Sequence, residues 1–392
     1  MRLTLALCFT LLLGLPVAAQ EIVITFGGDV NFARSRQKPS AKMIRKFGKF
    51  PIAETTAQLR DSWDGDVNFV NVETVVSARH GLPIVPKTFV FQSHPDNFRH
   101  LMDLGVNAFS LANNHSADHS FLGMRDTLEF FETESNRRAG LLFAGVGVGE
   151  AAFAPRVITI KGVRVALSAL SFGSGGFSPT ESRIGMAYLS VPKHYQAALD
   201  AMKAVQAEIK IMSFHFGVEN ALNIDWGQKA LFQRAVQEAG VNLVIGHHPH
   251  VVRGVEVLPQ KAAAIFYSMG NLLFIGGAEK DSKPLGADYG LLGKAYFYVS
   301  KGKTSLNALA AVPFKGVHLK PRKLSFRGVD ARVSHLNRLS RSSIGEKAAQ
   351  FSAPLEERPK GLQCLGAPYG EKSERLCCQL DDAALCDLPD LM

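Results

Sequence analysis

The sequence predicts an α/β fold from Glu21 to about Ser300, on three observations. Short apolar runs rich in β-branched residues recur along this region, as expected for buried strands. Segments with helical periodicity lie between the runs, and such alternation is typical of α/β proteins. Polar residues of the kinds that bind metals follow the runs directly. The composition agrees, since 46% hydrophobic and 20% charged residues are ordinary for a packed globular domain.

Strands are predicted at Ile22–Phe26, Val67–Val72, Asn107–Leu111, Lys210–Phe214, Val241–Ile245 and Ala263–Tyr267. A helix over Pro95–Leu104 begins with proline in its first turn and ends at Gly105, and a second over Gln228–Ala239 ends at Gly240. Arg156–Ile160 and Arg164–Leu170 flank Lys161-Gly162, which indicates a hairpin and some antiparallel pairing.

The first nineteen residues have the pattern of a secretory signal. Met1-Arg2 supplies a positive charge, Leu3 to Val17 is almost wholly apolar, and Val17-Ala18-Ala19 provides small residues for cleavage after Ala19. A membrane anchor is the alternative, but the run is shorter than the roughly 20 residues a bilayer core requires. We therefore expect export to the periplasm, the cell surface or the medium.

The net charge of +9 is concentrated in one stretch. Between Lys301 and Gly345 there are ten Lys and Arg residues and a single acidic residue, Asp330. One interpretation is a solvated basic face. The other is a docking surface for an anionic polymer, a polymer synthesis or export complex, or phospholipid headgroups. Nucleic acid fits poorly as a partner, because export is expected and no nucleic-acid motif is present.

Four of the five cysteines lie near the C-terminus, at Cys364, Cys377, Cys378 and Cys386. In an oxidising compartment an even, clustered set indicates disulfides, and four cysteines leave three pairings open. A zinc site is less favoured, because no clean pair of Cys-x-x-Cys motifs occurs. The expected organisation is a signal peptide over 1–19, a catalytic-type domain over 20–315, and a basic segment with a cysteine-rich tail over 316–392.

Ligand-type residues follow the six predicted strands. In order they are Gly28-Asp29 with Asn31, Asn71-Val72-Glu73, Asn113-Asn114-His115 with Asp118, His215 with Glu219, His247-His248-Pro249-His250, and Gly270-Asn271. Loops at the carboxyl ends of parallel strands converge on one crevice, so the six groups are expected to meet. Asp29 alone fits a helix cap, Asn114 a turn and His215 a satisfied core histidine. Together, carboxylate, amide and imidazole groups without thiolate suit Mn²⁺, Fe or Zn²⁺ in a hydrolytic site.

These motifs resemble those of the CapA-like proteins of capsule and poly-γ-glutamate biosynthesis. The resemblance runs from Glu21 to Phe274, and it omits the basic stretch and the cysteine tail. The family resembles a branch of the calcineurin-type metallophosphoesterases, which implies a four-layer α/β/β/α sandwich followed here by a small disulfide-stapled tail. The resemblance also implies one or two divalent metal ions.

Residue roles follow from the resemblance, position by position. Asp29 and His250 would bind the first metal, Glu73 would bridge, and Asn114, His215 and His248 would bind the second. His115 would protonate the leaving oxygen, and Asp118 would orient it. Asn31, Glu219 and Asn271 are expected outside the direct ligands, the latter two holding ligand imidazoles by hydrogen bonds. His247 is expected to be structural or to lie outside the ligand set.

Two departures from the wider phosphoesterase pattern concern the first metal. Asn31 stands where a histidine ligand is usual, and Glu73 where the bridging residue is usually the shorter aspartate. One tightly held ion is therefore as compatible with the sequence as two. Phe216 and His119-Ser120 also depart from the narrower CapA-like pattern, and they bear on substrate preference.

The sequence favours an exported metal-dependent hydrolase acting on a phosphoester or on an envelope polymer such as poly-γ-glutamate. The alternative is a non-catalytic accessory protein that keeps a metal and binds an anionic polymer through the basic stretch. A 5′-nucleotidase is less favoured, because no aromatic clamp for a base is apparent.

Overall fold

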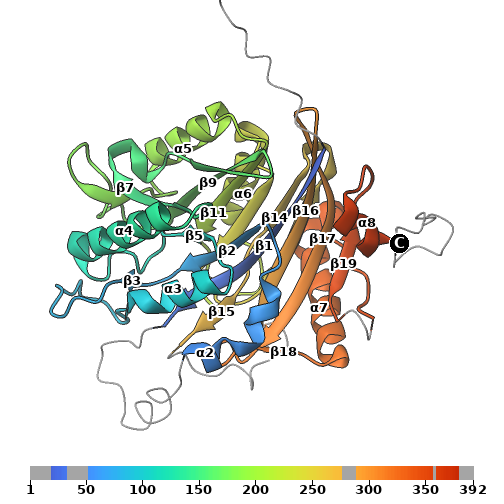
Figure 1. The fold of residues 1–392 in the computed structure, drawn as a ribbon, viewed down its shortest axis with the longest axis horizontal. Helices are drawn as coiled ribbons and strands as arrows, with labels where there is room; N and C mark the ends of the chain where they lie inside the picture. Colours follow the sequence, from blue (N-terminus) through green and yellow to red (C-terminus); the bar gives the residue numbers. More distant parts are fainter. Residues whose placement is uncertain (1–18, 33–51, 276–287, 356–358, 379–392) are drawn as a thin grey trace, which may run out of the picture.

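A computed structural model of the chain describes residues 19–32, 52–275, 288–355 and 359–378, and it consists of two facing β-sheets between layers of helices (Figure 1). This is the four-layer α/β/β/α arrangement expected from the sequence. The predicted signal segment, except for Ala19, lies outside the described residues. Within the described ranges, no helix is both long enough and apolar enough to cross a bilayer.

The first sheet is parallel on one side of β1 and antiparallel on the other. Its order is β18 (Arg322–Lys323), β17 (Lys303–Lys315), β16 (Gly290–Ser300), β1 (Gln20–Asn31), β2 (Val67–Val72), β5 (Ala108–Ser110) and β6 (Leu142–Ala144), with β15 (Asn271–Phe274) beside β1 and β19 (Gly361–Cys364) beside β17. Strands β1, β2, β5 and β6 run parallel, so their carboxyl ends lie at one edge.

The second sheet has a parallel centre with an antiparallel strand at each edge. Its order is β13 (Val255–Leu258), β14 (Ala263–Phe266), β12 (Leu243–His247), β11 (Ile209–His215), β9 (Val163–Ser171) and β8 (Arg156–Ile160). The four central strands are parallel, whereas β8 and β13 are antiparallel edges. The predicted hairpin is β8–β9. The short pairs β3 (Val75–Val76) with β4 (Gln92–Ser93) and β7 (Val146–Val148) with β10 (Ile184–Met186) stand apart.

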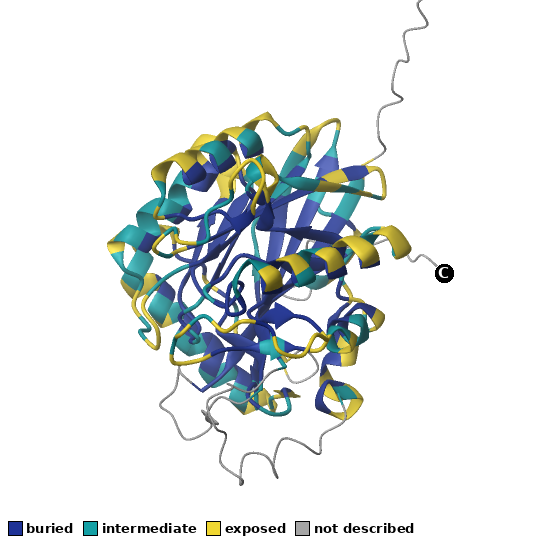
Figure 2. Ribbon diagram, turned by 90° about the vertical axis from the view of Figure 1, so that its left-hand side faces the viewer, coloured by how far each residue is buried: buried dark blue, intermediate teal, exposed yellow. Residues whose placement is uncertain are grey.

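Side-chain alternation along β9 explains why the second sheet is covered on both faces. Val165 and Leu167 belong to the core that also contains the first sheet, whereas Ala166 and Leu170 belong to the core under α5 (Pro192–Ala204) and α6 (Trp226–Ala239). Because side chains alternate across a strand, an apolar strand contributes buried side chains to the core on each face of the sheet. Figure 2 shows the resulting burial, concentrated in the strands and on the inner sides of the helices.

Helices α3 (Pro95–Asp103) and α4 (Ser120–Arg137) cover the outer face of the first sheet. The Phe131 ring of α4 lies 4.9 Å from that of Phe109 in β5 and 5.7 Å from that of Phe143 in β6. Aromatic pairs at such distances stabilise a core beyond their area burial, by about 0.5–1.5 kcal/mol. The short helix α2 (Ile52–Thr55) lies near α3.

Residues beyond 315 pack against the same core as the residues before it. Helix α7 (Phe326–Ile344) contacts β13 of the second sheet and β17 of the first, and Val329, Val333 and Leu336 join the main core. A disulfide between Cys364 and Cys377 connects β19 to α8 (Glu371–Cys377). It matches one of the pairs the sequence left open, whereas Cys386 lies outside the described residues.

The end of β1 is shaped by a close approach of two backbones. A Cβ atom on Gly28 would lie 1.9 Å from the carbonyl oxygen of Gly270, just before β15. Asp29 N also donates to that same oxygen at 3.1 Å, and the register of β1 shifts between Asp29 and Val30. Glycine at position 28 therefore allows β15 to pair with β1, where it sets the position of Asp29.

We predict that Gly28→Ala lowers the free energy of unfolding by about 1–3 kcal/mol, because the added methyl group must displace backbone. Urea unfolding measures this change. Gly227→Ala is the matched control: a Cβ there meets an oxygen of Asp225 at 3.4 Å, an ordinary contact, in the first turn of α6. That variant should be neutral or slightly stabilising. A Gly28→Ala protein as stable as the control would contradict the close approach.

Candidate metal centre

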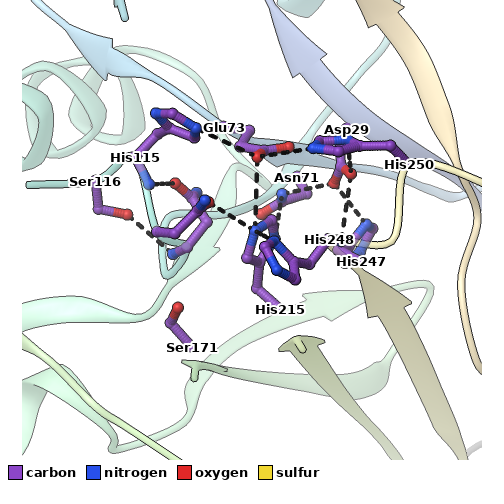
Figure 3. A network of polar contacts seen from close by, with 12 residues as sticks. Asp29, Asn71, Glu73, His115, Ser116, Ser171, His215, His247, His248 and His250 are labelled. Atoms are coloured by element: carbon purple, nitrogen blue, oxygen red, sulfur yellow. Dashed lines mark hydrogen bonds and ion pairs between the residues drawn. The ribbon is translucent and has the colours of Figure 1, made fainter. Parts of the chain in front are cut away.

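The structure brings all six predicted metal-binding residues to one place at the carboxyl ends of the parallel strands (Figure 3). Asp29 lies in β1, Glu73 directly follows β2, and His215 ends β11. The other three lie on loops, Asn114 after β5, and His248 and His250 after β12. Both sheets therefore contribute, as the convergence of strand ends requires.

Two groups of potential ligands share one carboxylate, that of Glu73. Ligand atoms of Asp29, Glu73 and His250 lie within 4.8 Å of one another, and so do those of Glu73, His215 and His248. Oε1 of Glu73 is 3.7 Å from His250 Nε2 on one side and 3.6 Å from His215 Nε2 on the other. This geometry matches the bridging position expected for Glu73.

Asn114 completes the second group. Its Oδ1 lies 2.9 Å from His215 Nε2, and His248 Nδ1 lies 3.1 Å from that same nitrogen. Three ligand-type atoms thus surround one point beside Glu73. Amide oxygen and imidazole nitrogen together suit a borderline divalent cation.

The Glu73 carboxylate is costly in this position without a cation. It is fully buried, and neither oxygen accepts a hydrogen bond from the described residues. Burial raises the pKa of Glu73 well above its usual value, and the nearby Asp29 carboxylate raises it further. An unsatisfied buried acceptor costs about 1–3 kcal/mol, so the orphaned oxygens are an independent indication that a cation fits here.

The neighbouring side chains are in the protonation states that metal binding needs. Burial and then the adjacent His248 hold the pKa of His215 well below its usual value, and burial lowers the pKa of His248 to about 4. For Asp29, burial alone would raise the pKa, but hydrogen bonds from His247 and His250 outweigh it and the pKa falls well below normal. Neutral imidazoles and an ionised carboxylate are the ligating forms.

The two loop histidines have strained backbone conformations. His248 has φ 93° and His250 has φ 56°, left-handed values that cost a non-glycine residue about 1–3 kcal/mol each. The His248 backbone N–H points at Asp29 Oδ2 at 3.4 Å. His247, the last residue of β12, is fully buried. Its Nδ1 lies 3.2 Å from Asp29 Oδ1, and its ring lies 5.8 Å from that of Phe69. It supports Asp29, in keeping with the structural role expected for it.

His115 and Asp118 form a pair beside the second group. His115 Nδ1 lies 2.7 Å from Asp118 Oδ2, and His115 Nε2 lies 3.8 Å from Glu73 Oε1. Asp118 also accepts a hydrogen bond from the Phe91 backbone at 2.6 Å, so the carboxylate is fixed. Burial lowers the pKa of His115, whereas the hydrogen bond to Asp118 raises it. The arrangement is that of an oriented imidazole whose Nε2 faces the ligand groups.

Residues 23–275 match the family described as bacterial capsule synthesis protein PGA_cap, which is more than half of the chain. The chain belongs to this family. The CapA-like resemblance of its motifs is thereby confirmed, and the matched region contains every predicted ligand as well as His115 and Asp118.

Individual relatives are distant. The chain is 28% identical over 208 residues to PGA biosynthesis protein CapA of Bacillus subtilis, covering 53% of each chain. It is 25% identical over 264 residues to capsule biosynthesis protein CapA of Bacillus anthracis, covering 66% of this chain and 61% of that one. It is also 28% identical over 248 residues to a Mycobacterium tuberculosis protein named "probable polyglutamine synthesis accessory protein", covering 59% and 62%. The chain thus spans between half and two thirds of the length of these relatives.

Solved structures with a similar fold include a phosphatase from Mycoplasma pneumoniae, with a TM-score of 0.43 and 15% identity over 75% of this chain and 93% of that one. A hypothetical protein from Thermus thermophilus gives the same TM-score, with 13% identity over 75% of this chain and 99% of that one. At TM-scores below 0.5 this likeness supports no conclusion about function.

Asn31, Glu219 and Asn271 were expected to lie outside the set of direct metal ligands, and their surroundings in this PGA_cap protein differ from one another. Asn271 Oδ1 lies 2.8 Å from His250 Nδ1, the contact expected of it. Asn31 is buried at the end of β1 and accepts from Ser93 Oγ at 3.4 Å. Glu219 differs from expectation: it is exposed, and no hydrogen bond to a ligand imidazole is seen among the described residues. It acts on His248 through its charge.

The position of Glu219 has a physical cause in the loop that carries it. Gly217, with φ 138°, turns the chain after His215, and the buried Arg253 guanidinium donates to the backbone oxygens of Val218 and Ala221 at 2.8 and 2.9 Å. The loop is therefore held by Arg253 rather than by a hydrogen bond between Glu219 and the candidate ligand histidines.

Sequence reasoning assigned no role to three residues that support the site. Asn71 Nδ2 donates to Asp29 Oδ1 at 2.8 Å and lies 3.2 Å from His215 Nδ1. The sequence feature that could have indicated this role is a polar residue within a buried strand. Lys87 pairs with Asp118 and donates to the Asn114 backbone oxygen at 2.8 Å. His318 Nε2 lies 3.4 Å from Asn271 Nδ2. The last two come from segments outside the strand-end pattern, which gave no signal for them.

We predict that Glu73→Gln makes the metal-free protein more stable at neutral pH, by about 1–2 kcal/mol, because a neutral amide replaces a buried unpaired carboxylate. Because burial raises the Glu73 pKa in the folded state, its contribution to stability is complete below the unfolded value near 4.5 and declines as pH rises. The stability difference between variant and wild type should therefore grow with pH above that value.

Chelator-treated protein unfolded in urea at several pH values measures this difference. The exposed Glu129→Gln variant is the control and should leave stability unchanged. Added Mn²⁺ at about 100 times its dissociation constant should stabilise the wild type by about 2.7 kcal/mol and the Glu73→Gln variant far less. Equal stabilisation of both proteins would contradict a cation site at Glu73.

Proposed function

We propose that this PGA_cap protein is an exported metal-dependent hydrolase that cleaves a phosphoester in the making or processing of an envelope polymer such as poly-γ-glutamate. The observation that carries the proposal is the buried Glu73 carboxylate shared by two ligand groups, with the His115–Asp118 pair beside it. A structural metal site does not require an oriented imidazole that is not itself a ligand, whereas a metal-dependent hydrolase uses one as a proton donor.

The residues present fit one or two divalent ions. Asp29, Glu73 and His250 would hold one, and Glu73, Asn114, His215 and His248 the other. Oxygen and nitrogen donors without thiolate favour Mn²⁺, Fe or Zn²⁺. When bound, such ions polarise a phosphoryl oxygen and lower the pKa of a coordinated water.

The remaining chemistry is assigned to residues of the chain itself. Asp118 holds the His115 Nδ1 proton, which leaves Nε2 as the position from which a proton can pass to the leaving oxygen. Lys87 forms an ion pair with the other Asp118 oxygen, which fixes the carboxylate beside the imidazole. The Phe91 ring, 4.4 Å from that of His115, limits the rotation of the imidazole and covers one side of it.

Export and the polymer are supported by observations outside the site. The predicted signal over residues 1–19 directs secretion, and the Cys364–Cys377 disulfide fits an oxidising compartment. A role with an anionic polymer is supported by the family and by the names of the Bacillus relatives.

A second candidate function is a non-catalytic accessory protein that binds the polymer or a membrane surface. It is favoured by the basic 301–345 stretch, in which Arg322, Lys323 and Arg327 are exposed. Part of the stretch is neutralised within the fold, since Lys315 and Arg332 pair with Asp288 and Lys320 lies 3.5 Å from Glu54. Cosedimentation with poly-γ-glutamate that survives loss of His115, but is lost when the exposed cations are neutralised, would favour this function.

We predict that His115→Ala retains its metal and loses 10²- to 10⁴-fold in kcat, about the contribution of a positioned proton donor. The measurement is Mn²⁺-supported hydrolysis of bis-(p-nitrophenyl) phosphate and p-nitrophenyl phosphate, beside metal analysis of the same samples. The exposed His80→Ala variant is the matched control and should behave as wild type. Undiminished turnover in His115→Ala would refute the assigned mechanism, and bound metal without turnover in the wild type would favour the accessory role.

A further inference from the structure

A cavity of about 190 Å³ lies directly beside the candidate metal centre. Asn114 and Asp118 line it on the side of the centre, and Lys87 stands between them. The opposite side is formed by the segment that follows β9. Because ligand pockets for larger molecules measure about 300–1,000 Å³, this cavity has room for one compact chemical unit.

The floor of the cavity is aromatic. Phe172 is 45% exposed, although it stacks on Phe216 with ring centroids 4.3 Å apart and an interplanar angle of 21°. One face of Phe172 is therefore covered and the other lines the cavity. Phe216 directly follows His215, so the stacked pair is fixed to the strand that carries a metal-binding residue. An exposed flat ring held in this way is typical of a binding surface.

The far wall is formed by Phe177 and Tyr188, and it depends on a glycine. A Cβ atom on Gly173 would lie 2.8 Å from Cε1 of Tyr188. Position 173 therefore has no room for a side chain while Tyr188 keeps its place, and the missing side chain keeps the cavity open between the two walls.

Three polar groups line the cavity together with the aromatic rings. They are the Lys87 ammonium, the Asn114 amide and the exposed Ser174 hydroxyl. Ammonium and amide N–H groups donate, and the hydroxyl both donates and accepts. A ligand with a flat apolar face and oxygens around its edge matches both features, and a sugar ring has that shape. A flexible aliphatic chain would make full use of neither the Phe172 ring nor the polar groups.

We propose that this cavity is a subsite for a single sugar unit, placed on the leaving-group side of the scissile phosphoester. This inference rests on the proposed hydrolase function. The leaving-group side is assigned because Lys87 and Asp118, which line the cavity, are the groups that orient the proton donor His115. In the step, water oxygen bonds to phosphorus and the water releases a proton to solvent. The bond from phosphorus to the sugar oxygen breaks with its electron pair on that oxygen, which takes the Nε2 proton of the His115 imidazolium, and His115 regains a proton from solvent.

The first test measures binding without turnover. Saturation-transfer NMR with methyl β-glucoside and the full-length protein should show transfer to the sugar, reduced several-fold in Phe172→Ala and in the cavity-narrowing Gly173→Ala. Phe326→Ala is the matched control, because Phe326 is a similarly exposed phenylalanine on α7, outside the cavity. Absence of transfer to the wild type, or equal transfer in all variants, would overturn the proposal.

The second test measures specificity. The ratio of kcat/KM for glucose 1-phosphate to that for n-propyl phosphate should be about 10 or more in the wild type and fall towards one in Phe172→Ala. Equal rates in the wild type would overturn the sugar subsite while leaving the hydrolase intact. A Phe172-dependent preference for adenosine 5′-phosphate over glucose 1-phosphate would also overturn it. Phe172-dependent sugar binding without cleavage of any ester would support the subsite and count against the hydrolase.

Discussion

The buried Glu73 carboxylate is the constraint on which the rest of the site depends. It is enclosed by Asp29, His115, His215 and His250, and it accepts no hydrogen bond from the described residues. A buried charge is tolerated when it is paired or coordinates a metal. Here the imidazoles of His115, His215 and His250 and the Asp29 carboxylate surround it, and imidazole and carboxylate groups are common ligands of divalent metals.

The fold brings these groups together because the carboxyl ends of the parallel strands of both sheets lie at the same side of the molecule. Glu73 and Asp29 come from neighbouring strands of the first sheet, while His215 and His248 come from neighbouring strands of the second. The apolar core between the sheets fixes their separation, and the approach of Gly28 to Gly270 fixes the end of β1. Strain at His248 and His250 is then confined to the loop that faces the ligands.

Much of this arrangement was predictable from the sequence. The apolar periodicity that marks strands and helices and the polar residues at strand ends are both visible within a few consecutive residues. Val67–Val72 has the predicted strand bounds, and α3 ends within one residue of prediction, since apolar periodicity and glycine stops act over a few residues. Ligand types at strand ends located the centre, because parallel strands share an edge. The region beyond 315 was harder, since packing of Val329 and Val333 onto the core depends on long-range contacts.

Contacts that come from long loops were not predictable. Lys87 lies in the segment between β3 and β4, and nothing in its local sequence indicates that it meets Asp118 and Asn114. Glu219 was expected to form a hydrogen bond to a ligand imidazole because it follows His215 closely, but Gly217 and the buried Arg253 hold the loop so that Glu219 is exposed. Proximity along the chain thus predicts a contact only where the backbone between the two residues is regular.

The most direct test of the account is a crystal structure of the protein grown with Mn²⁺, with anomalous scattering used to locate the ions. The account predicts ion density in contact with Glu73, flanked by Asp29 and His250 on one side and by His215 and His248 on the other. Ions found only elsewhere, or a Glu73 carboxylate with no ion beside it at saturating Mn²⁺, would contradict the central claim.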